Sequence, residues 1–255
     1  MIELLRTEHL SKSFGGLKAL SNIDITVYKN EIFGIIGPNG AGKTTLFNNI
    51  TSFNVPSEGK VYLDGKDMTG KNTTMFCKEG IARTFQNIRV FSQMTVLGNV
   101  LVGMHKNMTS NMFQIFLKTP SQKREERAAH DKAHEVLKFL GIDDVADRLA
   151  NCLPYGTQRK VEIARALISG PKLLLLDEPT AGMNPQETDD LMHLIAQIRD
   201  LNITIIVIEH NIKFMVNLCD RMAVLNFGQL LALDIPGKIK TNPEVIKAYI
   251  GEGEE

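Results

Sequence analysis

The 255-residue sequence has no excess charge of either sign, because 29 basic residues are matched by 29 acidic ones. No overall field therefore attracts nucleic acid, and DNA or RNA binding would require a local basic patch. Long apolar runs are also missing: no stretch approaches the roughly 18 apolar residues of a membrane-spanning helix. The N-terminal segment MIELLRTEHL carries acidic residues and lacks the apolar core of a secretion signal. We expect any membrane association to be made through a partner.

Cysteine is scarce. Cys77, Cys152 and Cys219 lie far apart, with no C-x-x-C pair and no histidine at zinc-finger spacing. An odd, scattered set excludes a disulfide framework and favours a reducing compartment, so we expect three reduced, buried thiols. The remaining composition is that of a globular protein, with 43% hydrophobic and 23% charged residues, and suits one large or two small domains.

The most specific motif present is GPNGAGKT at residues 37–44, which matches the pattern G-x-x-x-x-G-K-[ST]. An apolar run precedes it and a segment that can begin a helix follows it, a context that disfavours a glycine-rich turn that binds nothing. Glycines allow successive backbone amides to point into one concavity, and a helix N-terminus and a lysine add positive charge. The sequence therefore predicts a triphosphate site formed by Gly37, Pro38, Asn39, Gly40, Ala41, Gly42, Lys43, Thr44 and Thr45.

Strand patterns dominate the first quarter of the chain. Residues 3–9 and 23–27 alternate between apolar and polar side chains, and residues 60–63 follow a proline and glycine turn signal. These segments predict an antiparallel β-sheet. Phe14, followed by two glycines, places an aromatic ring at a turn next to these strands.

Strand patterns disappear between residues 95 and 150. Apolar residues at positions 133, 136, 137 and 140 predict an amphipathic helix that ends at Gly141. We expect residues 90–155 to form a helical insertion within an α/β domain. A group of large apolar side chains in this region forms either its internal core or a contact surface for a partner: Met94, Met104, Met108, Met112, Phe113 and Phe116.

Helix and strand patterns alternate in the second half. A helix at 158–169 should end at the Gly-Pro pair that follows it, and apolar runs at 172–177 and 204–208 are typical of strands buried on both faces of a parallel sheet. Between these strands, Asn184 caps a helix that reaches Asp200. Strands at 222–225 and 229–233 and a short helix at 243–250 complete an α/β pattern.

Two carboxylates, Asp177 and Glu178, follow the first of these buried strands. Asp177 is suited to hold Mg²⁺ together with the hydroxyl of Thr44, because Mg²⁺ prefers a few hard oxygen ligands plus water and phosphate. Glu178 is suited to orient a water molecule that attacks the γ-phosphate. An Asp-Glu pair can also be a simple helix cap, but its combination with a phosphate loop predicts nucleotide hydrolysis.

Six motifs together resemble the ATP-binding subunit of an ABC transporter. Besides the phosphate loop they are RTFQ ending at Gln86, LPYGTQRKVEIARAL from Leu153, LLLLDEP from Leu173, AGMN from Ala181 and IEHN around His210. They occur in the order found in that family and cover nearly the whole chain. The resemblance implies a P-loop NTPase core with a parallel sheet, an N-terminal antiparallel β subdomain and an inserted α-helical subdomain, within one domain of residues 1–255.

The resemblance also implies roles for single residues. Phe14 would stack on adenine, and His210, just past the strand at 204–208, would contact the γ-phosphate. Gln86 would link Mg²⁺ and the attacking water to a membrane partner. In isolation, a glutamine or a histidine at these places is more often structural.

The signature segment departs from the family pattern LSGGQ. It consists of Pro154, Tyr155, Gly156, Thr157 and Gln158. Pro154 has neither a hydroxyl nor an N–H group to offer a phosphate, whereas Gly156 and the start of a helix remain. In the family this segment completes the ATP site of a second subunit, so the chain is expected to pair with a copy of itself or with a sibling.

Four segments resemble the larger ATP-binding subunit of branched-chain amino-acid importers: RTFQNIRVFSQMTVLGNVLVGMH at 83–105, the variant signature with Tyr155, AGMNP and the ending NPEVIKAYIGE. Related ABC ATPases for urea or amide import or for lipopolysaccharide export share several of these features. Three classes outside transport also stay open: a soluble ABC ATPase, a phosphate-loop kinase and a catalytically idle nucleotide sensor. The resemblance implies ATP and Mg²⁺ as ligands, permease subunits and a second ATP-binding subunit as partners, indirect contact with a solute-binding protein, no nucleic acid, and a place on the cytoplasmic face of the membrane.

Overall fold

The computed structural model describes residues 1–104 and 120–250. Four members of the apolar group noted above, Met108, Met112, Phe113 and Phe116, lie outside the described residues. Of the other two, Met104 packs partly buried against the core, and Met94 is 36% exposed. The choice between core and contact surface therefore stays open for this group.

A six-stranded sheet forms the centre of the molecule, with the strand order β11-β10-β4-β9-β8-β7. Neighbouring strands run parallel except for β10 and β11, which pair antiparallel. Every residue of β8 and β9 is buried, which confirms the prediction from their continuous apolar runs, and β4 is buried in the same way. The strands are β4 (Ile32–Ile36), β7 (Ile81–Arg83), β8 (Leu173–Asp177), β9 (Thr204–Ile208), β10 (Arg221–Asn226) and β11 (Gln229–Asp234).

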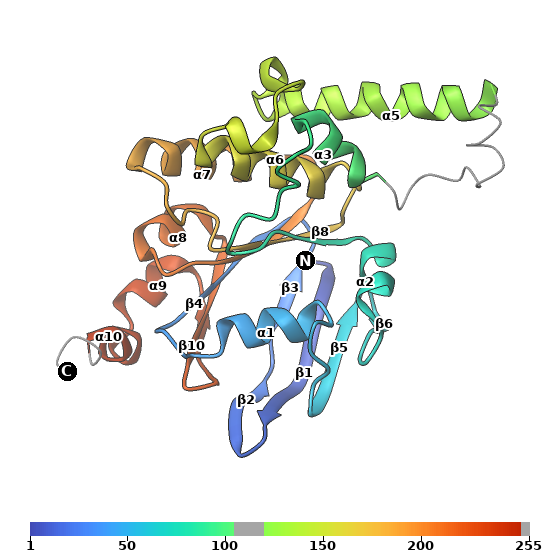
Figure 1. Ribbon diagram of the computed structural model, residues 1–255. Coiled ribbons are helices and arrows are strands. Elements are labelled where there is room, and N and C mark those ends of the chain that lie inside the picture. Colours follow the sequence, from blue (N-terminus) through green and yellow to red (C-terminus); the bar gives the residue numbers. More distant parts are fainter. Residues whose placement is uncertain (105–119, 251–255) are drawn as a thin grey trace.

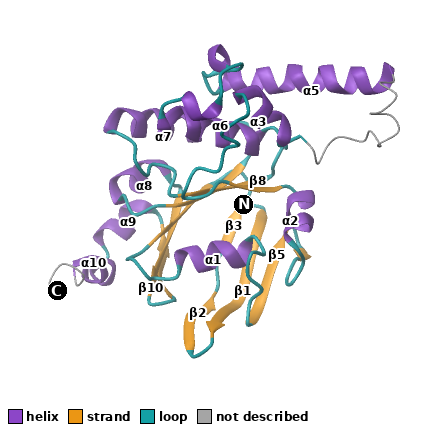
Figure 2. Cartoon of the chain, in the orientation of Figure 1, coloured by secondary structure: helices purple, strands orange, loops and turns teal. Residues whose placement is uncertain are grey.

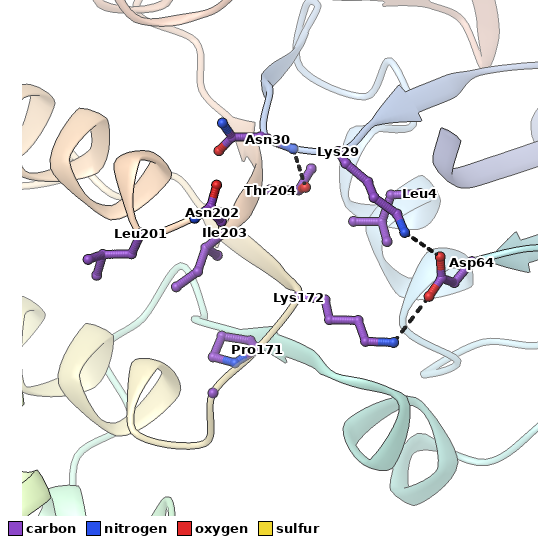
Figure 3. Close-up of a pocket in the computed structure, with 11 residues that line it drawn as sticks. Leu4, Lys29, Asn30, Asp64, Pro171, Lys172, Leu201, Asn202, Ile203 and Thr204 are labelled. Carbon is purple, nitrogen blue, oxygen red and sulfur yellow. Dashed lines mark hydrogen bonds and ion pairs between the residues drawn. The ribbon is translucent and has the colours of Figure 1, made fainter. Parts of the chain in front are cut away.

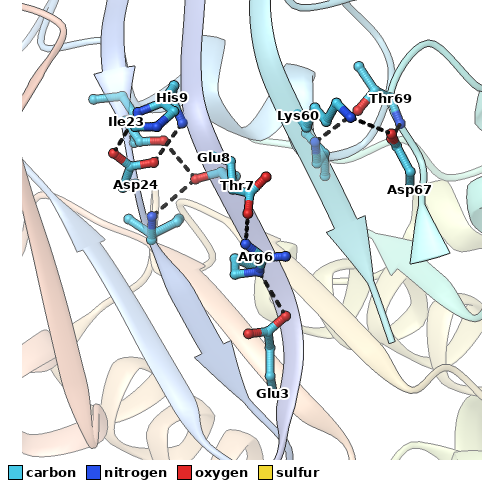
Figure 4. A network of polar contacts seen from close by, with 12 residues as sticks. Glu3, Arg6, Thr7, Glu8, His9, Ile23, Asp24, Lys60, Asp67 and Thr69 are labelled. Carbon is cyan, nitrogen blue, oxygen red and sulfur yellow. Dashed lines mark hydrogen bonds and ion pairs between the residues drawn. The ribbon is translucent and has the colours of Figure 1, made fainter. Parts of the chain in front are cut away.

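A second, antiparallel sheet comes from the N-terminal part of the chain. It contains β1 (Glu3–Phe14), β2 (Leu17–Ile23), β3 (Thr26–Tyr28), β5 (Glu58–Leu63) and β6 (Lys66–Asp67). The single strand expected at 23–27 is wrong, because the chain breaks at Asp24 between β2 and β3. There the Asp24 carboxylate accepts a bond of 2.6 Å from the His9 amide, and the Thr7 hydroxyl donates to the Ile23 carbonyl (Figure 4).

Helices cover the six-stranded sheet on the side away from the second sheet, while α1 packs between the two sheets (Figures 1 and 2). Side chains that alternate along one strand explain the two cores: Leu174 and Leu176 of β8 face the helices, and Leu173 and Leu175 face α1 and the antiparallel sheet. The helices are α1 (Lys43–Ile50), α2 (Thr73–Glu79), α3 (Val96–Val102), α5 (Pro120–Phe139), α6 (Tyr155–Leu167), α7 (Pro185–Asp200), α8 (Ile212–Leu218), α9 (Pro236–Thr241) and α10 (Pro243–Ile250).

Local sequence signals account for several helix ends. Asn184 and Glu187 form a reciprocal capping box at the start of α7, as the cap prediction required. The amphipathic pattern near residue 133 is the C-terminal part of α5. The described residues between 90 and 155 contain helices and short 3-10 turns, and the named strands of the structure all lie outside them. The assignment of 90–155 as an inserted subdomain stays a prediction.

The expectation of three buried thiols is correct only for Cys219. Cys77 on α2 and Cys152 in a surface 3-10 turn are exposed. Burial raises the pKa of the Cys219 thiol well above its ordinary value. Whether a cysteine is buried depends on which face of its element meets the core, and spacing in the sequence does not show this.

Candidate nucleotide-binding and hydrolysis site

The predicted phosphate loop connects β4 to α1. Gly37 has a φ of +153°, and a Cβ at this position would lie 2.2 Å from the carbonyl oxygen of Leu225, so only glycine fits. Gly42 occupies the N-cap of α1 and provides no side-chain cap. The first amides of α1 are thus left for an external acceptor, and a phosphate is the natural one.

Lys43 lies over this loop. Its ammonium group donates hydrogen bonds of 2.5 Å to the Gly37 carbonyl and 2.7 Å to the Pro38 carbonyl, and the residue is only 7% exposed. The positive charge is therefore held at the concave face that the loop amides line. Together, the uncapped helix and the anchored lysine fit a phosphate chain.

The two predicted carboxylates lie at the carboxyl end of β8, as the sequence implied. Asp177 is paired in register with Ile208 of β9, and the Glu178 amide donates to the Ile208 carbonyl at 2.9 Å. Glu178 has a φ of +44°, in the left-handed region that residues with a side chain rarely adopt. Such strain persists where neighbouring structure enforces it and is common at functional sites.

Gln86 meets this edge from a distant part of the sequence. Its Nε2 donates a hydrogen bond of 2.9 Å to Oε2 of Glu178, across 92 positions. Gln86 comes three residues after β7, which pairs in parallel with β8, so both side chains emerge at the same edge of the sheet. The structure therefore brings together two residues that the sequence associated only through the family resemblance.

His210 follows β9, the neighbour of β8, and its imidazole is 64% exposed at the same edge. The residue before it, Glu209, belongs to the IEHN motif but was given no role from the sequence, and its side chain is fully buried. The Glu209 carboxylate accepts hydrogen bonds from the Thr180 amide at 2.8 Å, the Thr180 hydroxyl at 2.5 Å and the His210 amide at 3.2 Å. It thus ties the segment after β8 to the segment after β9.

Phe14 lies at the end of β1 and is 47% exposed. The ammonium of Lys12 is 5.1 Å from the centre of its ring. The next strand, β2, touches the phosphate loop, since a Cβ at Gly42 would lie 2.8 Å from the Ala19 carbonyl. The hairpin that carries Phe14 therefore borders the loop, and stacking on adenine stays a prediction.

The signature residues lie at the start of α6, with Pro154 at its N-cap and Tyr155 41% exposed. Among the described residues, no hydrogen bond joins this segment to the phosphate loop of the same chain. Tyr155 instead packs on Gly182, where a Cβ would lie 3.3 Å from the ring. The segment is thus presented at the surface, as a site completed by a second chain requires.

Directly after the signature segment, a fully buried arginine holds the Gln86 segment. Arg159 donates to the carbonyls of Phe85 at 2.6 Å and Gln86 at 2.8 Å, and it pairs with Glu162 at 2.7 Å. Glu162 in turn accepts from the Phe85 amide at 3.3 Å. Sequence reasoning missed this clamp, because Arg159 and Glu162 lie on the polar side of the helical pattern, where charged side chains are ordinarily solvated.

The donor set fits Mg²⁺ bound with a nucleotide. Within residues 1–104 and 120–250 no group of three His, Cys, Asp or Glu side chains could hold a metal by itself. Asp177 and the exposed hydroxyl-bearing Thr44 at the start of α1 instead offer a few oxygens beside the phosphate loop. That arrangement suits Mg²⁺, which keeps several waters and binds phosphate oxygens.

A hollow of about 480 Å³ lies away from the phosphate loop (Figure 3). Its lining includes Lys172, the residue before β8, and Thr204, the first residue of β9. This is the opposite, amino-terminal edge of the parallel sheet. Lys29 and Lys172 both pair there with Asp64, at 2.7 and 3.1 Å, and hold the pKa of its carboxyl below the ordinary value. The lysine charges are engaged with that carboxylate, so this hollow is not a candidate phosphate site.

None of the described helices has the length and apolar character needed to cross a membrane.

A family model described as "ABC transporter" matches residues 20–181. The chain is 44% identical to the high-affinity branched-chain amino acid transport ATP-binding protein LivG of Escherichia coli, over 98% of both chains. It is 42% identical to the corresponding protein BraF of Pseudomonas aeruginosa, again over 98% of both chains.

Solved structures agree with these relatives. A nucleotide-free ATP-binding cassette from an ABC transporter superimposes with a TM-score of 0.85 and 38% identity, covering 98% of this chain and all of the other. The ADP conformation of such a cassette gives a TM-score of 0.86 at the same identity and coverage. These similarities confirm the predicted fold.

Proposed function

Because this chain belongs to the ABC transporter family, whose ATP-binding domains are ATPases, we propose that it powers the import of branched-chain amino acids. Two observations support the proposal. The near-full-length relatives LivG and BraF are named for that transport. The assignment of ATP hydrolysis rests on the hydrogen bond between Gln86 and Glu178. This bond lies at the carboxyl-terminal edge of the six-stranded sheet, where the phosphate loop also begins.

In the proposed site, the loop amides and Lys43 bind the β- and γ-phosphates of ATP, and Phe14 stacks on the adenine. Asp177 and the Thr44 hydroxyl hold Mg²⁺, which when bound neutralises phosphate charge. Glu178 orients the attacking water and accepts its proton, while Gln86 holds the Glu178 carboxylate in place through its amide. His210 contacts the γ-phosphate from the next strand end.

The site is complete only in a dimer. Residues 154–158 of one chain would face the phosphate loop of another, and their position at the surface supports this arrangement. Gly156 and the amides at the start of α6 would supply the contact, since Pro154 has no N–H group. The partner is a second copy or a related subunit.

We further propose that the helical insertion and the Gln86 segment dock on permease subunits at the cytoplasmic face of the membrane. The Arg159 clamp supports this idea, because its hydrogen bonds fix the backbone around Gln86 to α6, the helix that begins with the signature segment. A permease bound to the insertion would thus act on both halves of the site.

ATP turnover of the purified chain is the first test. Lys43→Ala should abolish Mg²⁺-dependent turnover, whereas the exposed Lys60→Ala should leave it unchanged. Equal activity of the Lys43 variant and the parent would refute the hydrolysis site. Glu178→Gln with MgATP should sediment as a dimer, and a strictly monomeric result would contradict the shared site.

The cargo requires the assembled transporter. Membrane vesicles that contain this chain together with the permease that co-purifies with it should take up radiolabelled leucine in an ATP-dependent manner. Glu178→Gln should eliminate this uptake. Uptake of urea in place of leucine, or no association with membranes, would contradict the proposed cargo while leaving ATP hydrolysis intact.

A further inference from the structure

Arg83, the last residue of β7, lies next to Asp177 on the neighbouring strand. One guanidinium nitrogen, Nη2, is 2.7 Å from Oδ2 of Asp177, and the two side chains are 8% and 6% exposed. The other, Nη1, donates to Oδ1 of Asn48 at 2.8 Å and to the Thr51 hydroxyl at 3.1 Å. A single planar group therefore joins the end of β8 to α1, the helix that begins in the phosphate loop.

Three aromatic rings surround the same guanidinium. The centres of the Phe47, Phe53 and Phe85 rings lie 5.3, 5.4 and 5.2 Å from its central carbon. Phe53 and Phe85 also pack edge to face, with centroids 5.7 Å apart. Phe85 is the residue before Gln86, so the position of Arg83 is fixed from the Gln86 segment as well.

Stability alone gives no reason for a charge at this place. A buried ion pair is often no more stable than apolar side chains of the same volume. Here the Nε of Arg83 is also buried without a hydrogen-bond partner among the described residues, which adds a desolvation penalty. Such a pair is better explained by the geometry it imposes on its carboxylate.

We propose that Arg83 is a positioning residue, which holds Oδ2 of Asp177 so that the other oxygen, Oδ1, faces the metal that accompanies the nucleotide. This inference rests on the proposed role of Asp177. Among the described residues Oδ1 accepts no hydrogen bond, so it is available. Gln86 holds Glu178 in the same way, and one segment after β7 thus orients both carboxylates at the end of β8.

The distinction between charge and geometry can be tested with Arg83→Lys. Lysine keeps the positive charge, but a single ammonium cannot hold Asp177 and the oxygens of α1 in one plane. Mg²⁺ should strengthen the binding of a fluorescent ATP analogue, and the Mg²⁺ concentration that gives half of this effect is the quantity to measure. In Arg83→Lys we expect that concentration to rise by roughly 10-fold, the size of effect seen when a residue that orients a metal ligand is replaced. Binding of the same analogue in EDTA should equal that of the parent.

Asn48→Ala provides a milder variant, in which the buried ion pair remains and only one anchor on α1 is lost. Its Mg²⁺ requirement should rise about 2- to 3-fold, in the same direction. This variant keeps the test decisive if Arg83→Lys folds poorly.

The matched control is Arg221→Lys. Arg221 also pairs with a buried carboxylate, Glu31 at 3.3 Å, and lies 5.0 Å from the ring centre of Tyr28, but at the opposite edge of the sheet. It should lower thermal stability without changing the Mg²⁺ requirement. An unchanged or lower requirement in folded Arg83→Lys, or an equal shift in Arg221→Lys, would overturn the proposal. If the parent protein itself did not bind the nucleotide analogue in EDTA, the proposed function would be refuted instead.

Discussion

Glu209→Gln should destabilise the protein and slow ATP turnover, although the substitution changes almost no volume. The amide oxygen of glutamine can replace Oε1 and keep both bonds from Thr180. Its NH₂ group would then face the His210 amide, so that an acceptor is replaced by a donor. An unsatisfied buried donor costs about 1–3 kcal/mol, and each Thr180 bond loses the strength that an ionised acceptor provides. We expect a loss of about 2–3 kcal/mol.

Urea unfolding followed by circular dichroism measures this free energy, and steady-state kinetics measure the effect on turnover. If the displacement of His210 adds half of this loss to the activation barrier of hydrolysis, turnover should fall by about 10-fold, because 1.4 kcal/mol in a barrier is a tenfold change in rate. The KM for ATP should change little, since the phosphate loop is untouched.

Thr180→Val supplies the control, because it removes only the hydroxyl donor and should cost about 1 kcal/mol. Residues that share a hydrogen bond are not additive, so the double variant should show a coupling of about 1 kcal/mol with Glu209→Gln. Additive losses, or a Glu209 variant within about 0.5 kcal/mol of the parent, would show that this carboxylate does not tie the two strand ends together.

Three further outcomes follow from the structure. A thiol reagent should label the two exposed cysteines in the native protein and Cys219 only after unfolding; labelling of three thiols before unfolding would contradict its burial. Burial raises the pKa of the Glu31 carboxyl above its ordinary 4.5, so protonation of this group favours the folded state. The free energy of unfolding of the parent, compared with that of Glu31→Gln, should therefore fall as the pH rises from 4 through the raised pKa. A flat difference between the two unfolding curves would refute this assignment. Gly37→Ala should abolish nucleotide binding measured by fluorescence, since its Cβ would lie 2.2 Å from a backbone oxygen; parent-like affinity would be inconsistent with that contact.

Sequence patterns predicted the elements whose signals are local. The apolar runs of β4, β8 and β9 specify strands buried on both faces, and the Asn184 cap specifies the start of α7. The helices α2, α8 and α9 were not anticipated, because each has only six or seven residues and too few turns to establish a period.

The candidate site divides in the same way. The phosphate loop could be predicted in full, since its glycines, its lysine and the helix that follows are consecutive and each has a physical reason. The functions of Gln86 and His210 came only from the family resemblance, because neither residue has a neighbour in the sequence that reveals its task. Their places at the strand ends are consistent with that interpretation.

Sequence by itself therefore determined the fold class, the phosphate loop and the carboxylates at the end of β8, because local chemistry and periodicity encode them. Only the tertiary structure decided which side chains hold those carboxylates. Arg83 and Gln86 reach Asp177 and Glu178 across more than 90 positions, through the pairing of β7 with β8. Glu209 and Arg159 likewise have no neighbour in the sequence that identifies their partners. Their burial and their partners exist only once two sheet edges and a helix have packed together.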